Sequence, residues 1–221
     1  MAQRSEADSE TASTGATGQP SAEAASLANA LVSGTSTTSM EQYVEQLLQP
    51  NATVSGPAAQ VLEALAQVKP ELLTPHIELL VKHLSSAQIH VAQCCAHCLP
   101  ALARVAPAKV AKQLKTMQTA FPDAPEIAKD GLVRTFVALC VASVTYQKRL
   151  IESFELALRT ADAQQLPLWV EHILPALKGE PYAQARSVVE QRLPDPELPR
   201  DVAQRIADFL GVKLRPLPDR K

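Results

Sequence analysis

Apolar residues recur at steps of three and four positions through most of the chain, which is the spacing of amphipathic helices. The pattern is clearest between Pro70 and Pro107, where two apolar stripes flank a polar turn at 85–88. The first stripe comprises Ile77, Leu80, Val81 and Leu84, and the second comprises Val91, Cys94, Cys95, Cys98, Leu102 and Val105. Because a lone helix cannot bury such a stripe, the sequence predicts two helices that pack on each other and on neighbours. Pro100 lies within the second run and is expected to bend it.

The same two-helix unit is expected to recur with a period of about 37 to 40 residues. Further helices are predicted at 39–48, 57–68, 107–121, 123–142, 146–160, 166–177, 182–193 and 199–210. Ser39 with Gln42, and Asp123 with Glu126, have the spacing of capping boxes at helix starts. The segment 132–142 is apolar almost all round, which predicts a helix at the centre of the fold. Gly131 precedes it and is expected to let another helix approach closely.

The unit at 70–107 resembles a HEAT repeat. The resemblance lies in Pro75 opening the first helix, the leucine-rich run to Leu84, the turn into Ile89-His90, and the small-residue second helix that closes with Leu102-Ala103. It implies an all-α fold, a right-handed α-α superhelix of the HEAT/armadillo-like solenoid type. It also implies an extended surface that binds other macromolecules.

Composition divides the chain into three parts. The segment 1–38 is rich in Ser, Thr and Ala with a few acids, so we expect a disordered tail in which 22–32 forms at most a transient helix, either as solvated chain or as a motif that folds on a partner. The segment 39–212 is expected to form the solenoid, and 213–221 a basic, proline-containing tail. Aromatic residues make up only 4% of the sequence, which favours helices packed through Ala, Leu and Val.

The cysteines indicate a reducing compartment. Cys94, Cys95, Cys98 and Cys140 all fall within apolar helical patterns, and three are too close together for a secreted disulfide framework. The first three could form a zinc site with His90 and His97, but side chains spread around one helix cannot close a tetrahedron, so we expect buried thiols, no metal and no cofactor. The start of the chain lacks the basic and apolar regions of a signal peptide, and no apolar run reaches membrane-spanning length. We therefore expect a protein of the cytoplasm or the nucleus without a membrane role.

Two groups of side chains are candidates for partner binding. His90, His97 and Arg104 share one helix, away from its apolar stripe, and either line a ligand-facing surface or form an ordinary polar face. No acid occurs between Glu78 and Asp123, whereas this stretch carries several cations that either form a positive patch or cluster by chance on a solvated face. These cations are Lys82, Arg104, Lys109, Lys112 and Lys115.

The sequence therefore predicts a non-enzymatic scaffold or adaptor subunit. Its partner would be another protein with an acidic surface or peptide, bound through the concave or basic face, and the chain could be one subunit of a larger complex. The alternative is a tubulin- or nucleic-acid-binding module that uses the basic patch at 79–122. A helical-repeat enzyme such as a DNA-base glycosylase would need a carboxylate and aromatic side chains grouped in the concavity, and Trp169 is the only tryptophan in the chain.

Overall fold

The computed structural model describes residues 20–214, and within this range every regular element is a helix. The all-α prediction is confirmed. The helices are α1 (Ala22–Ser33), α2 (Met40–Leu47), α3 (Ala52–Val68), the 3₁₀ helix η1 (Pro70–His76), α4 (Ile77–Lys82), α5 (Ile89–Val105), α6 (Pro107–Lys112), α7 (Leu114–Ala120), α8 (Glu126–Ala142), α9 (Thr145–Thr160), α10 (Gln165–Ala176), α11 (Gly179–Arg192) and α12 (Arg200–Leu210).

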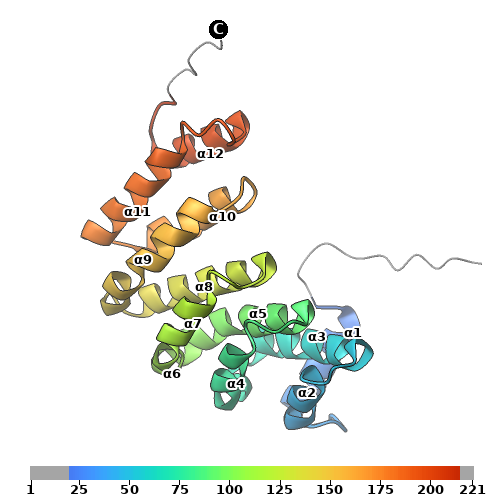
Figure 1. Cartoon of the computed structure of the whole chain (residues 1–221). Coiled ribbons are helices and arrows are strands. Elements are labelled where there is room, and N and C mark those ends of the chain that lie inside the picture. Colours follow the sequence, from blue (N-terminus) through green and yellow to red (C-terminus); the bar gives the residue numbers. More distant parts are fainter. Residues whose placement is uncertain (1–19, 215–221) are drawn as a thin grey trace, which may run out of the picture.

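The helices form two rows. In the first row α3, α5, α8, α10 and α12 follow one another, each in contact with the next, and we call them the ladder helices. The second row consists of α2, η1 with α4, α6 with α7, α9 and α11, and we call them the flanking helices. The chain alternates between the rows, so that the stack advances from α1 and α2 at one end to α12 at the other (Figure 1).

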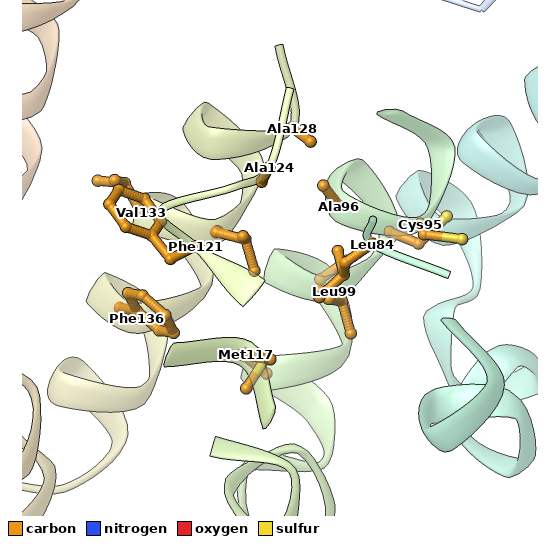
Figure 2. Close-up of a cluster of buried hydrophobic side chains, with 14 of the residues drawn as sticks. Leu84, Cys95, Ala96, Leu99, Met117, Phe121, Ala124, Ala128, Val133 and Phe136 are labelled. Carbon is orange, nitrogen blue, oxygen red and sulfur yellow. The ribbon is translucent and has the colours of Figure 1, made fainter. Parts of the chain in front are cut away.

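Four of the eight aromatic residues lie together in the core between the rows. The ring centroid of Phe121 lies 6.1 Å from that of Phe136 and 6.4 Å from that of Trp169, and Phe136 lies 6.3 Å from Phe154. All four side chains are fully buried. They link α8, α9, α10 and the end of the α7 segment, and Figure 2 shows Phe121 and Phe136 with the aliphatic residues around them. Such tilted rings contribute beyond the apolar area that they bury.

The close approach predicted at Gly131 is confirmed. A Cβ atom at this position would lie 2.5 Å from the carbonyl oxygen of Ala96 and 2.6 Å from its carbonyl carbon. The backbones of α5 and α8 are therefore in direct contact here. Ala96 of α5 faces Gly131 of α8, whose side chain is a single hydrogen atom. The neighbouring Leu132, Val133 and Phe136 are buried, as expected for a central helix, but Val141 near the end of α8 is exposed, so the helix is not covered all round.

The boundary predicted for the N-terminal tail is wrong for its described part. Residues 22–33 form α1, which packs on α3 with Ala24 and Ala28 buried. The sequence showed too little bulk to hold a helix there, but small side chains suffice where two helices approach closely. Residues 1–19 of the predicted tail, and 215–221 of the basic C-terminal tail, lie outside the described residues.

Several helix limits also differ from the prediction. Helix α3 begins at Ala52 rather than 57, because the Asn51 side chain accepts a hydrogen bond from the amide of Thr53 and caps it. The single helix predicted at 107–121 is divided into α6 and α7 at Gln113.

The two predicted capping boxes had different outcomes. The box of Ser39 and Gln42 is present, with both reciprocal hydrogen bonds. The box of Asp123 and Glu126 is absent. Pro125 occupies the N-cap position in an extended conformation, so Asp123 lies two residues before the N-cap and does not cap the helix. Because the ψ angle of Pro125 is 144°, the helical conformation begins one residue later, and α8 starts at Glu126.

Substituting Gly131 with alanine is expected to destabilise the protein by about 1 to 2 kcal/mol. The added methyl group must displace the backbone of α5, which costs more than the roughly 1 kcal/mol that alanine gains in helix propensity. Urea unfolding followed by circular dichroism measures the change.

Gly56→Ala is the matched control. Gly56 also lies within a ladder helix, but a Cβ atom there would have no heavy atom within 4 Å. This variant should be unchanged or more stable by up to about 1 kcal/mol. Equal effects of the two substitutions would contradict the close contact between α5 and α8.

Candidate interaction surface

The two candidate histidines of α5 contact α3 rather than open solvent. The Nε2 atom of His90 lies 2.7 Å from the hydroxyl oxygen of Ser55, which is itself buried. The Nδ1 atom of His97 lies 3.5 Å from a carboxylate oxygen of Glu63. These contacts join two ladder helices, so the ring nitrogens named are already engaged within the fold.

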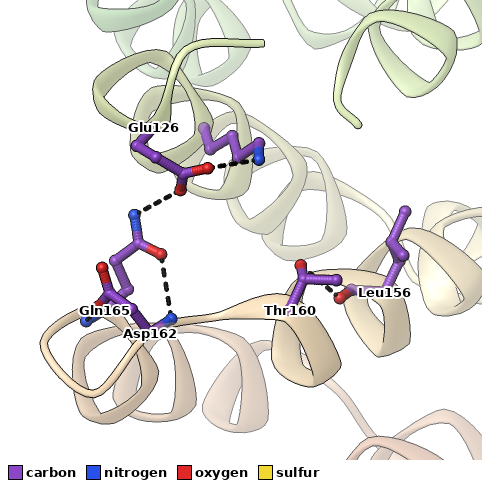
Figure 3. Close-up of polar contacts among 6 residues, drawn as sticks. Glu126, Leu156, Thr160, Asp162 and Gln165 are labelled. Atoms are coloured by element: carbon purple, nitrogen blue, oxygen red, sulfur yellow. Dashed lines mark hydrogen bonds and ion pairs between the residues drawn. The ribbon is translucent and has the colours of Figure 1, made fainter. Parts of the chain in front are cut away.

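Polar bridges of the same kind continue along the ladder helices. Gln165 of α10 donates to the carboxylate of Glu126 in α8 over 3.0 Å, and Figure 3 shows this contact. The same carboxylate accepts from Lys129 over 2.6 Å, and this bond, with that of Gln165, lowers the pKa of Glu126 despite the opposing effect of partial burial.

Two more bridges follow. The indole nitrogen of Trp169 donates to Asp130 over 3.1 Å, and Arg205 of α12 lies 2.7 Å from a carboxylate oxygen of Glu171 in α10. Sequence reasoning did not identify these pairs. Their only signal is a separation of 34 to 39 residues, close to the repeat period.

The candidate lysines lie on the flanking helices and are exposed. Lys82 ends α4, Lys109 and Lys112 lie on α6, and Lys115 lies on α7, which contacts both α4 and α6. We call these four residues the basic surface. Within residues 20–214 none of them forms an ion pair, and the ion pairs of that range lie on other parts of the fold.

The predicted candidates therefore separate into two groups. His90 and His97 serve contacts between ladder helices, whereas the four lysines project from the flanking row. Arg104 is exposed near the end of α5, where the chain leaves the ladder for α6. The histidines and the lysines therefore lie on helices of different rows.

The cysteines are buried and free. The thiol of Cys94 donates to the carbonyl oxygen of Ala59 over 3.4 Å, and that of Cys98 to the carbonyl oxygen of Leu62 over 3.6 Å, so both contact the backbone of α3. Within the described residues, no three His, Cys, Asp or Glu side chains are grouped so that they could hold a metal ion.

Cys95 and Cys98 have the spacing of a redox-active pair, which sequence reasoning passed over. Their environment opposes that role. Burial raises the pKa of Cys95 far above its ordinary value. The pKa of Cys94 is also raised, first by a hydrogen bond with Cys98 and second by burial. Reactive thiols need the opposite shift and access to solvent.

No helix in the range 20–214 is both long and apolar enough to cross a bilayer.

Comparison with known proteins gives a fold and nothing further. No protein-family model and no curated protein matches the sequence. The crystal structure of an engineered protein, a Northeast Structural Genomics Consortium target, superposes with a TM-score of 0.61 over 86% of this chain and 87% of the other. The two sequences are 17% identical, so the likeness concerns the helical fold alone.

The buried thiols predict a specific dependence of stability on pH. Burial raises the pKa of Cys140 to about 12 from an ordinary 9.0. When folding raises the pKa of a thiol, its stabilising contribution is fully present at pH values below the pKa of the unfolded chain. The contribution is lost as the pH rises from that pKa to the pKa of the folded protein. The free energy of unfolding should fall by about 1.4 kcal/mol per pH unit for each such thiol above pH 9.

Urea unfolding at pH 8 and pH 10 measures this loss, and Cys140→Ala should show a smaller loss than the parent chain. Ellman's reagent provides an independent check at pH 8. The folded protein should react slowly at all four cysteines and completely in denaturant. Rapid reaction of Cys95 or Cys98 in the folded state would contradict their burial.

Proposed function

We propose that this protein is a non-enzymatic scaffold or adaptor that binds an acidic segment of another protein through the basic surface. The observation that carries this proposal is the group of exposed lysines at 82, 109, 112 and 115 on α4, α6 and α7, of which α7 contacts the other two, with no ion-pair partner in the described part of the chain. Among the lysines of residues 20–214 only Lys129 forms an ion pair, so the four lysines are distinguished by their grouping on neighbouring helices rather than by the lack of a partner. Positive charge that the fold leaves uncompensated is available to a partner.

The contribution of such a surface is electrostatic. Exposed lysines attract a negatively charged segment over about one Debye length, roughly 8 Å at physiological ionic strength. This attraction raises the rate of association and sets the orientation of the partner more than it adds affinity, since each exposed ion pair is worth at most about 1 kcal/mol. Tight binding would require additional apolar contacts.

We further infer that the helix pairs form a right-handed superhelix of the HEAT/armadillo-like type. The alternation of the chain between ladder and flanking rows supports this, as do the polar bridges at a nearly constant sequence separation. A solenoid exposes a long surface relative to its mass, which suits a scaffold. The four free, buried cysteines support a reducing compartment, the cytoplasm or nucleus.

Charge reversal at Lys109, Lys112 and Lys115 tests the proposal. The probe is a fluorescein-labelled oligoglutamate peptide, and its binding is measured by fluorescence anisotropy at low and at physiological salt. The triple Lys→Glu variant should bind at least about tenfold more weakly than the parent chain, and the affinity of the parent should fall as salt rises.

The matched control replaces Lys178, Arg200 and Lys213 with glutamate, three exposed cations that lie outside the basic surface. This control has the same net charge as the test variant and should change binding by no more than about twofold. Equal losses in both variants would mean that only net charge matters and would contradict the proposal. A labelled DNA duplex is the second probe. If the parent chain binds DNA more tightly than oligoglutamate and the test variant loses this binding, the partner is a nucleic acid and not an acidic protein segment.

A further inference from the structure

Four exposed valines lie where ladder helices end. Val68 is the last residue of α3, Val105 is the last residue of α5, and Val141 and Val144 lie on either side of the end of α8. Their exposed fractions are 54%, 41%, 73% and 64%, and Val141 and Val144 are the two most exposed large apolar side chains in residues 20–214. We call these four residues the valine row. Single exposed apolar residues are ordinary, but a set repeated at one position of three successive helices is not scattered.

The repetition has a local cause in the sequence. Val68 and Val105 are each followed by one residue and then a proline, and each proline begins the next helix. The intervening Lys69 and Ala106 have extended φ angles of −151° and −138°, because a residue before proline is disfavoured in the helical conformation. The chain therefore leaves the ladder in the same way twice, and the valine is left at the turn. The connections from α5 to α6 and from α8 to α9 lie at the same side of the stack (Figure 1).

Positive charge surrounds the valine row. The segments 68–71, 104–109 and 141–149 each include the end of a ladder helix and the first residues of the next helix, and together they contain five exposed cations and a single acid, Glu71. The cations are Lys69, Arg104, Lys109, Lys148 and Arg149. None of the five forms an ion pair within the described residues. Apolar side chains bordered by cations are complementary to a partner segment that carries both apolar and acidic residues.

The other ends of the ladder helices provide a contrast. Val54, Ile89, Ile127 and Leu168 are also exposed, near the starts of α3, α5, α8 and α10. The segments around them, 51–54, 86–90, 123–127 and 162–168, contain three acids and no lysine or arginine. The two edges are therefore similar in apolar exposure and opposite in charge, so an acidic occupant is directed to the valine row.

The spacing of the row restricts the conformation of the occupant. Packed helices lie about 8–10 Å apart, so successive valines are offered at about that interval. A polyproline II segment has three residues per turn and a rise of about 3.1 Å per residue, which brings every third side chain to the same face at intervals of about 9 Å. A β-strand repeats on one face after about 6.6 Å and does not match.

We propose that the valine row binds an acidic protein segment in the polyproline II conformation, with an apolar side chain at every third position. One such side chain meets the end of each of α3, α5 and α8, and the acidic residues between them meet the bordering cations. This inference rests on the proposed scaffold function and specifies the partner segment, since the basic surface and the valine row meet at Lys109.

The test compares two labelled peptides of identical composition by fluorescence anisotropy. The first consists of three consecutive Leu-Pro-Glu triplets, and the second is an isomer with its leucines at alternate positions. The parent chain should bind the triplet peptide about tenfold more tightly than the isomer, because only the triplet peptide aligns its leucines with the three helix ends. The double variant Val105→Ser, Val141→Ser should bind both peptides equally.

The control is Ile89→Ser, Ile127→Ser, which removes equivalent exposed side chains from the opposite edge and should keep the preference. Equal affinity of the parent chain for the two peptides would overturn the inference, as would loss of the preference in the control. Two other outcomes would also overturn the inference. They are preferential binding to vesicles that contain phosphatidylserine and concentration-dependent dimerisation, if either behaviour is abolished in the valine variant.

The valine variant retains every lysine, so the two proposals fail separately. Oligoglutamate binding without any preference between the two peptides leaves the scaffold proposal intact and rejects the valine row. Absence of oligoglutamate binding rejects the basic surface, whatever the peptides show.

Discussion

The backbone contact between α5 and α8 is the constraint on which the rest of the stack depends. Gly131 lies so close to the carbonyl group of Ala96 that no larger residue fits between the two helices. Both helices are 17 residues long and occupy the middle of the ladder, so their distance fixes the positions of everything attached on either side. The aromatic group of Phe121, Phe136, Phe154 and Trp169 then fills the adjacent space between the rows.

The polar bridges between ladder helices add direction to this packing. Apolar contacts alone tolerate small rotations of one helix against the next. The hydrogen bond from Trp169 to Asp130 is lost on rotation, and its partly buried partners are then left unpaired. The pair of His90 with Ser55 has the same effect between α3 and α5. These side chains therefore hold the ladder in register and are unavailable to a partner.

The surface that remains is divided by charge. The basic surface of the flanking helices and the cations beside the valine row are without ion pairs in the described residues, whereas the acids near the starts of the ladder helices include Glu126, which pairs with Lys129. A scaffold of this composition, with a formal net charge of −2, would recognise its partners through local rather than overall charge.

The sequence by itself determined the helices and the character of most of their faces. Periodicity located the apolar stripes, the cap of Ser39 with Gln42 fixed one helix start, and Gly131 indicated a close crossing, because these features depend on residues near in sequence. Only the tertiary structure decided that α1 is packed, that the histidines are engaged with α3, and that the lysines lie in the other row. Each of these outcomes depends on which residues some 35 positions apart become neighbours, and the helical period does not contain that information.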